Sequence, residues 1–330
     1  MAKYEKITLV FPGQGSQYPG MGKELFENFA CVREVYAQAN RILDYDLTSQ
    51  CIGKPNLGKK IVQKWDLNKT VYTQPAVLTT SYACYKAMEE TFQKNGIKLN
   101  VSLLAGHSLG EYTALLVSGA MNFETCLRLV RKRAEYMSEL GKGYPGAGMM
   151  AIIDKNGGLN YDRIRELCRD FEVHITLNNS RRQIVVGGSK RQLGAMAKRL
   201  KREKKLATML NVEGPFHTPI MKPAASKFKR ELDKSDVSIA SKPVVANVST
   251  DAIVDPDHIR KELYRQIFQV VDWRRSMEKA VGNGGNLFIE VGPKRVLTNM
   301  LKDIAPAVSG MNIEDMGSLE RAVQALTNNN

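Results

Sequence analysis

The sequence predicts an α/β protein in which a mainly parallel sheet carries a small inserted domain. Four short, apolar and β-branched runs are spread over the chain, and each is followed by a turn or a helix. This is the pattern of a buried parallel sheet. Between Gly148 and Val212 the pattern of predicted elements changes, and short strands and helices follow one another more closely. The four runs are Ile7–Phe11, Val101–Ala105, Val244–Val248 and Leu287–Val291.

The first run, Ile7–Phe11, leads into the glycine-rich turn "PGQGSQYPGMG". Two phosphate-binding templates fail on it. A dinucleotide fingerprint needs a third glycine where Tyr18 stands, and a phosphate loop needs a lysine where Met21 stands. The turn therefore does not predict a nucleotide site, and from its own residues it is a tight turn at the end of a buried strand.

The clearest predicted helix begins near Thr73, in the stretch "TQPAVLTTSYACYKAMEETFQKNG". Pro75 is expected in its first turn and Gly96 just beyond its end, the positions that these two residue types favour.

The second run, Val101–Ala105, leads into Gly106-His107-Ser108-Leu109-Gly110 and then directly into an apolar helix. This is a Gly-x-Ser-x-Gly motif in the strand–turn–helix context that it requires. The sharp turn projects the hydroxyl of Ser108 above the sheet, and the helix N-terminus favours developing negative charge. The motif predicts a nucleophilic serine, although so short a pattern also occurs by chance.

The segment from Gly148 to Val212 has the element order βαββαβ, which is the ferredoxin-like unit. We expect residues 144–212 to form this insert and residues 1–143 and 213–330 to form the main domain. The expected elements are strands at Gly148–Asp154, Val173–Asn179, Gln183–Gly188 and Leu206–Val212, with helices at Tyr161–Phe171 and Lys190–Glu203.

A nucleophilic serine needs a base, and the chain has 4 histidines. His107 is held inside the turn, His174 lies in a strand of the insert, and His258 lies in a polar helix near acidic residues. His217, in the loop "EGPFHTPIM" that returns to the main sheet, is the best candidate. No obvious acid lies between Ser108 and His217, so the order differs from the serine, acid, histidine order of ordinary esterases.

The net charge of +14 comes from 48 basic and 34 acidic residues and favours an acidic partner. The densest cluster is Lys190–Leu206, where apolar residues at helical spacing leave a basic outer face. The other interpretations are a solvated surface helix and a binding site for the phosphorylated tail of a cofactor. No aromatic residues are interleaved there, so a nucleic-acid partner is not expected.

The composition also bounds the location of the protein. No apolar run is long enough to span a bilayer, and the N-terminal residues have no signal-peptide core. The 5 cysteines are scattered without Cys-x-x-Cys spacing. We therefore expect a cytoplasmic protein with reduced thiols and no membrane partner.

Five blocks of the sequence together resemble the malonyl-CoA:acyl-carrier-protein transacylase family. They are "FPGQGSQYPGMG", "AGHSLGEYTAL", "GAGMMAI", "GPFHTPIM" and "IEVGPKRVLTNML", in the expected order from about Ile7 to about Leu301. That family includes the enzyme of fatty-acid synthesis and freestanding, trans-acting acyltransferases of polyketide synthases. The resemblance implies a hydrolase-like α/β domain with a ferredoxin-like insert.

The resemblance also implies roles for individual residues. Ser108 matches the nucleophile and His217 the base, while the backbone carbonyl of Gln266 takes the place of the missing acid. The backbone N–H groups of Gln14 and Leu109 match the oxyanion hole, so the turn after the first strand is expected to hold an oxyanion rather than a phosphate.

Three further residues match the substrate pocket of the family. Arg133 matches the arginine that holds the malonyl carboxylate. Without the resemblance, Arg133 would be interpreted as a surface residue of a basic helix. Phe216 would leave little room for a methyl branch on the substrate, and Asn179 resembles an asparagine near the active site.

The implied activity is transfer of a malonyl group from malonyl-CoA to the phosphopantetheine thiol of an acidic acyl carrier protein, through a malonyl-serine. No bound cofactor and no metal are expected, and the protein is expected to be a monomer. The alternatives are an acyl hydrolase that clears carrier proteins of a polyketide synthase, and a non-catalytic scaffold. The sequence does not separate a fatty-acid from a polyketide pathway.

Overall fold

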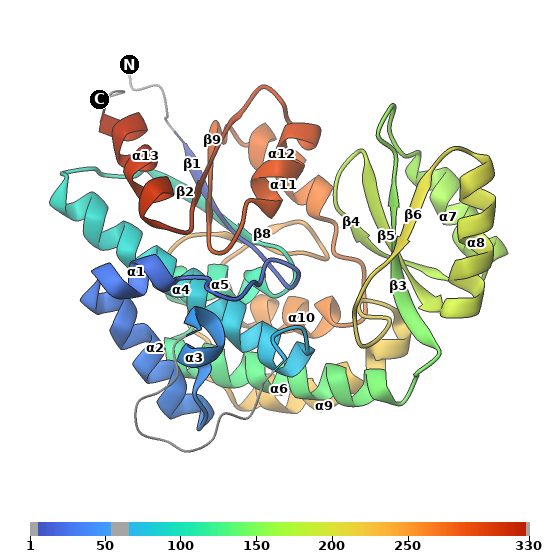
Figure 1. Cartoon of the computed structure of the whole chain (residues 1–330), viewed down its shortest axis with the longest axis horizontal. Helices are drawn as coiled ribbons and strands as arrows, with labels where there is room; N and C mark the ends of the chain where they lie inside the picture. Colours follow the sequence, from blue (N-terminus) through green and yellow to red (C-terminus); the bar gives the residue numbers. More distant parts are fainter. Residues whose placement is uncertain (1–5, 54–65, 328–330) are drawn as a thin grey trace.

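The computed structural model describes residues 6–53 and 66–327 and contains two sheets (Figure 1). The six-stranded main sheet has the order β10-β9-β1-β2-β7-β8, and its strands are parallel except for β8. The predicted α/β class is therefore confirmed. The strands are β1 Ile7–Phe11, β2 Val101–Gly106, β7 Val244–Val245, β8 Ala252–Ile253, β9 Leu287–Val291 and β10 Ser309–Ile313.

Helices cover both faces of the main sheet. Leu9 and Phe11 of β1 point into the larger core, beneath helices such as α4, α5 and α6, whereas Val10 points into a smaller core beneath α11 and α12. This alternation along one strand follows from the pleat. The helices outside the insert are α1 Lys23–Asn28, α2 Ala30–Leu43, α3 Leu47–Ile52, α4 Thr70–Lys94, α5 Gly110–Val117, α6 Phe123–Lys142, α9 Lys222–Lys234, α10 Pro256–Gln266, α11 Trp273–Gly282, α12 Val296–Ile304 and α13 Met316–Thr327.

Two predicted elements have different bounds in the structure. The strand expected over Val244–Val248 ends at Val245, because the N–H of Ala246 bonds to the carbonyl of Asp251 and the chain turns back into β8. Helix α4 begins at Thr70, so Pro75 lies inside the helix rather than in its first turn. A side chain distant in sequence caps the helix at this position, because the backbone N–H of Thr70 donates to Glu213 Oε2 at 2.8 Å.

The insert has the expected element order, with a four-stranded antiparallel sheet in the order β4-β5-β3-β6. Helices α7 and α8 cover the face that points away from the main domain (Figure 1). The opposite face contributes Met149, Ala151 and Val185 to the core of the main domain. The elements are β3 Ala147–Ile153, α7 Tyr161–Asp170, β4 His174–Asn178, β5 Gln183–Ser189, α8 Lys190–Arg202 and β6 Leu206–Met209.

The division into residues 144–212 and the two flanking segments remains a prediction, and residues 1–5, 54–65 and 328–330 of those segments lie outside the described residues. The two chain segments that join the insert to the main domain touch each other. A Cβ on Gly141 would lie 2.4 Å from the carbonyl oxygen of Glu213, and one on Gly214 would lie 2.9 Å from the Cα of Gly141. Only glycines allow this crossing.

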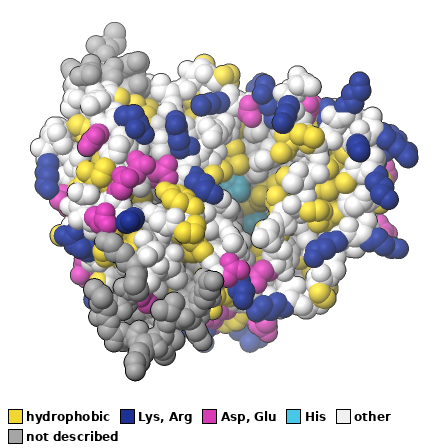
Figure 2. All heavy atoms as spheres, in the orientation of Figure 1, with side chains coloured by type: hydrophobic (Ala, Val, Ile, Leu, Met, Phe, Trp, Pro, Cys, Tyr) yellow, Lys and Arg dark blue, Asp and Glu magenta, His cyan; other side chains and the backbone are white. Residues whose placement is uncertain are grey.

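Figure 2 shows a hollow between the main domain and the insert, with histidine atoms at its floor. The segment after α10 links the insert to the main domain. The N–H of Asn178 in β4 donates to the carbonyl of Val271 at 2.9 Å, and the N–H of Asp272 donates to the carbonyl of Asn247, just after β7, at 2.9 Å. Among the described residues, no helix is both long and apolar enough to cross a bilayer.

Candidate active site

Ser108 lies in a strained turn between β2 and α5. Its φ is 49°, in the left-handed region that residues other than glycine rarely adopt. The two glycines of the motif are required by close packing: a Cβ on Gly106 would lie 1.9 Å from the carbonyl carbon of Gly110, and one on Gly110 would lie 2.0 Å from the carbonyl oxygen of Phe11. The turn therefore holds Ser108 at the carboxyl edge of the sheet, as the motif predicts.

Asn247, which lies just after the neighbouring strand β7, holds this turn in place. Its Oδ1 accepts from the N–H of Ser108 at 2.7 Å, and its Nδ2 donates to the carbonyl of Gly106 at 2.7 Å. Asn247 was not among the predicted site residues. Its position was a usable signal, because a polar residue just after a parallel strand lies at the edge of the sheet where sites form.

The serine, the predicted base and the predicted carbonyl form one hydrogen-bonded chain. Ser108 Oγ lies 2.8 Å from His217 Nε2, and His217 Nδ1 lies 2.6 Å from the backbone carbonyl of Gln266. A carbonyl only accepts, so Nδ1 carries the proton and Nε2 is left to accept from the serine hydroxyl. His217 also has a positive φ, 60°, and its N–H bonds to the carbonyl of Ile267.

The imidazole of His217 is neutral in this setting. Burial lowers its pKa to about 3, and the positive charge of Arg133 contributes to the shift. Both causes disfavour the imidazolium form. The group can therefore accept a proton at neutral pH. A cleft of about 740 Å³ reaches this residue between α7 and the segment after α10.

The other three histidines do not contact Ser108 Oγ. His107 Nε2 lies 2.8 Å from Asn179 Oδ1, and its ring packs edge-on against Trp273. Asn179 is thus beside the active-site turn, as expected, but it is held by His107 and by a bond to Gln183 Oε1 at 2.8 Å. His174 is exposed in β4 of the insert.

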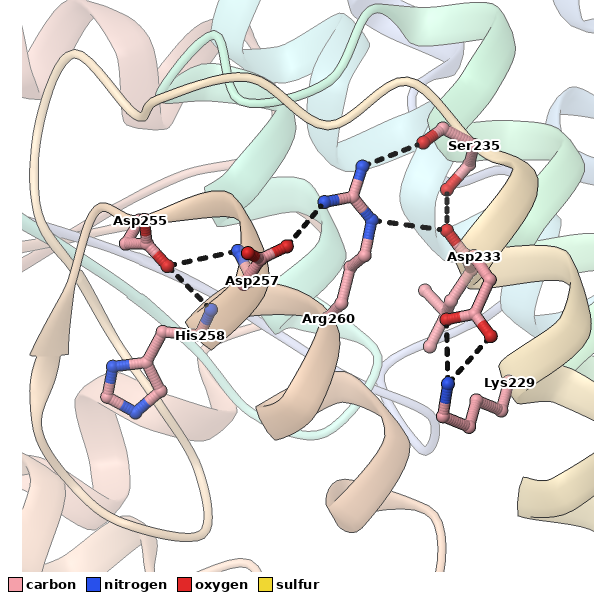
Figure 3. A network of polar contacts seen from close by, with 8 residues as sticks. Lys229, Asp233, Ser235, Asp255, Asp257, His258 and Arg260 are labelled. Carbon is pink, nitrogen blue, oxygen red and sulfur yellow. Dashed lines mark hydrogen bonds and ion pairs between the residues drawn. The ribbon is translucent and has the colours of Figure 1, made fainter.

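His258 belongs to a network at the start of α10, as Figure 3 shows. The carboxylate of Asp255 caps the helix by accepting from the backbone N–H groups of Asp257 and His258. Arg260 links this helix to the end of α9 through the carbonyl of Ser235. The imidazole of His258 points away from these bonds, so the network is a structural junction between two helices.

The turn after β1 packs directly onto the serine turn. A Cβ on Gly13 would lie 2.3 Å from the carbonyl oxygen of His107, and the N–H of His107 bonds to the carbonyl of Phe11. Within the described part of the chain, the backbone N–H groups of Gln14 and Leu109 donate to no protein acceptor. Free N–H groups on both sides of a nucleophile are what an oxyanion hole requires.

Arg133 lies on the buried stripe of α6, with only 1% of its surface exposed. On the same helix, Arg128 is exposed and Arg131 is half-buried, and both pair with acids. The surface interpretation of Arg133 is therefore wrong. The signal in the sequence was its position, one helical turn from the apolar residues Val130 and Met137.

The guanidinium of Arg133 reaches the nucleophile. Its Nη2 donates to Ser108 Oγ at 3.0 Å and to Gln266 Oε1 at 2.9 Å, and its Nη1 donates to Gln74 Oε1 at 2.6 Å. No carboxylate of the described residues lies within ion-pair distance of Arg133. A buried cation with neutral partners is costly unless a ligand supplies the counter-charge.

Besides Asn247, three side chains at this site were not predicted. Gln74 and the side chain of Gln266 hold the guanidinium, and Glu111 lies behind them. Gln74 is a polar residue near the start of α4, directly before the apolar stretch Pro75–Leu78, which was a detectable signal. Phe216, which was predicted, is 5% exposed and precedes His217 at the edge of the main core.

A nucleophile turn, a histidine and a buried cation on an α/β sheet define an enzyme of the acyl-transfer class. The chain matches the family model described as the acyl transferase domain over residues 8–329, and it belongs to that family.

Individual relatives carry more specific names. The chain is 35% identical to the malonyl CoA-acyl carrier protein transacylase of Bacillus subtilis (strain 168), covering 98% of each protein. It is 37% identical to the transacylase of the same name from Salmonella typhimurium, covering 96% of this chain and 99% of that one. A solved malonyl-transacylase, in complex with a type II polyketide synthase acyl-carrier protein, has a TM-score of 0.87 at 34% identity, covering 97% of this chain and 100% of that one.

Proposed function

We propose that this protein transfers a malonyl group from malonyl-CoA to the phosphopantetheine thiol of an acyl carrier protein, through a malonyl ester of Ser108. The names of its relatives support the activity. The observation that carries it is the 3.0 Å contact between Arg133 Nη2 and Ser108 Oγ. A buried cation at the nucleophile selects an acyl group that has its own negative charge.

In the first half-reaction, His217 Nε2 takes the proton of Ser108 while Oγ attacks the thioester carbonyl. The N–H groups of Gln14 and Leu109 stabilise the oxyanion, and loss of one such donor typically costs about 3 kcal/mol of transition-state stabilisation. The adduct then expels coenzyme A, whose sulfur takes the proton from His217. In the second half-reaction the thiol of the carrier protein attacks the ester, and the same steps run in reverse.

A carbonyl in place of an acid suits this reaction. The carbonyl of Gln266 fixes the tautomer of His217 but offers a dipole rather than a charge, so it stabilises the imidazolium less than a carboxylate does. Thiols ionise near pH 8.5 and leave easily compared with amines or alcohols. A moderate acid is therefore sufficient for both leaving groups.

Arg133 can bind the malonyl carboxylate in a two-point contact. A guanidinium has five N–H groups, and each pair that faces a carboxylate includes Nη2. The substrate carboxylate therefore takes over one of the two Nη2–H groups, which point to Ser108 Oγ and to Gln266 Oε1 in the substrate-free enzyme. Phe216 beside His217 would disfavour a methyl branch on the α-carbon, by roughly 1–3 kcal/mol.

We further propose that the carrier protein is acidic and docks near α8 of the insert. Lys and Arg side chains gather along this outer edge of the molecule (Figure 2). Arg199 pairs with Glu203, whereas Lys198, Lys201 and Arg202 form no ion pair within the described residues. Unpaired basic residues can steer an acidic partner.

We also propose that the protein is a monomer in the cytoplasm. All 5 cysteines lie in the described residues and carry free thiols, which suits a reducing compartment.

The test follows malonyl from donor to acceptor. The enzyme is mixed with malonyl-CoA and a holo carrier protein, and intact-mass spectrometry measures malonyl-carrier protein while an enzymatic assay measures free malonate. Transfer should exceed hydrolysis by a large factor. Malonate release without carrier acylation would favour the hydrolase, and absence of both products would favour the scaffold.

A further inference from the structure

Glu111 is a buried acid that the proposed mechanism does not use. It lies in the first turn of α5, immediately beyond the serine turn, and 0% of its surface is exposed. Its Oε2 accepts from Gln266 Nε2 at 2.5 Å, but its Oε1 has no hydrogen-bond partner in the described part of the chain. A half-satisfied buried carboxyl group destabilises a fold, so its presence at an active site points to a role.

One amide group connects this acid to the substrate-binding cation. Gln266 Oε1 accepts from Arg133 Nη2, and Gln266 Nε2 donates to Glu111 Oε2. The same Nε2 donates to the backbone carbonyl of Ser108 at 2.8 Å, so the amide cannot easily rotate. The bonds run in one direction, from the guanidinium through the amide to the carboxyl group, and each polarises the next.

The surroundings decide the charge of Glu111. Burial raises its pKa to about 8, and the buried carboxylate of Glu262 on α10 acts in the same direction. Glu262 is itself paired with Arg265 at 2.6 Å. The bond from Gln266, the backbone of Asn247 and the charge of Arg133 on α6 oppose this rise in the pKa. Tyr112, the neighbour on α5, has a raised pKa because of burial and stays neutral.

We propose that Glu111 is a specificity-determining residue. As a neutral acid it leaves the charge of Arg133 available to the substrate carboxylate; as a carboxylate it neutralises Arg133 and repels that substrate. This inference rests on the proposed role of Arg133.

The consequence is a pH-dependent selectivity. Below about pH 8, Glu111 is protonated, so the malonyl carboxylate binds a guanidinium of Arg133 whose charge no nearby carboxylate of the described residues neutralises. Above it, the ionised Glu111 disfavours a second carboxylate in the same low-dielectric site. An acetyl group carries no charge and does not respond. Titration of other catalytic groups affects both substrates and cancels in the ratio of their rates.

The experiment compares the wild type with Glu111→Gln, which keeps the shape of the side chain and removes its titration. The malonyl-to-acetyl ratio of kcat/KM is measured from pH 6.5 to 9.5. In the wild type the ratio should fall by about fivefold or more, the usual lower range for coupling between two sites. In Glu111→Gln it should stay constant. Glu262→Gln should move the midpoint of the fall to lower pH, because one source of the raised pKa is removed.

A ratio that does not fall in the wild type, or that falls equally in Glu111→Gln, overturns the inference. Failure of the underlying role of Arg133 looks different. In that case Arg133→Ala leaves the ratio unchanged at neutral pH, where Glu111 is protonated in either account.

Discussion

Replacement of Arg133 by alanine should change which acyl group the enzyme accepts. In the wild type, the buried guanidinium provides two charge-assisted hydrogen bonds to a malonyl carboxylate, each worth about 1.5–3 kcal/mol. Acetyl makes neither bond. The loss of about 3–6 kcal/mol corresponds to a fall of about 10²- to 10⁴-fold in the malonyl-to-acetyl ratio of kcat/KM, at tenfold for each 1.4 kcal/mol. Acetyl loading should hold or rise.

The assay measures single-turnover acylation with malonyl-CoA and acetyl-CoA by intact mass. Arg128→Ala is the matched control, because Arg128 lies on the same helix but is exposed and paired with Glu124 at 2.8 Å. Arg133→Lys keeps the charge but not the two-point geometry, so its ratio should be intermediate. Thermal melting checks the fold, since the mutation leaves the side-chain oxygens of Gln74 and Gln266 without their donor.

An unchanged ratio in Arg133→Ala, with malonyl and acetyl loading reduced equally, would refute this reasoning. It would mean that the arginine only supports Ser108 and does not read the carboxylate.

Three further outcomes are expected. Because the pKa of His217 is lowered to about 3, the base stays neutral in mild acid, and kcat/KM for acylation should show no fall between pH 7 and about pH 5; a loss centred near pH 6.5 would contradict this. Charge reversal on the outer face of α8 should slow transfer to the carrier protein, less so at high salt, but spare acylation by malonyl-CoA; equal loss in both half-reactions would exclude the docking role. The reversed residues are Lys198, Arg199, Lys201 and Arg202. Gly110→Ala should lower the free energy of unfolding by about 1–3 kcal/mol or more, since its Cβ would lie 2.0 Å from the carbonyl oxygen of Phe11; a wild-type melting temperature would contradict this.

The sequence predicted the parts of the fold that have strong local signals. The apolar runs of β1, β2 and β9 and the βαββαβ order of the insert are such signals, and the structure contains all of them. Strand β10, Ser309–Ile313, was missed because its residues "SGMNI" do not form an apolar run; its pairing with β9 is a tertiary effect. The early start of α4 was missed for a similar reason, since its cap comes from Glu213.

The predicted site residues do meet in space, but their support was less predictable. Ser108 and His217 are found by a motif and by elimination among few histidines. Asn247, Gln74 and Glu111 support the site only because separate segments converge at one edge of the sheet. Their bonds go to the N–H of Ser108, to Arg133 and to Gln266, respectively. No local sequence pattern predicts such contacts between distant segments, although a polar residue inside an apolar segment indicates a candidate site residue.

The central claim is that the malonyl group passes through Ser108. Its most direct test mixes the enzyme with malonyl-CoA, isolates the acylated protein, and maps the adduct by peptide mass spectrometry. A holo carrier protein is then added and loss of the adduct is followed. We expect one malonyl group on Ser108, transfer of that group to the carrier, and no adduct in Ser108→Ala. A stable adduct in Ser108→Ala, or a wild-type adduct that the carrier protein cannot remove, would contradict the account.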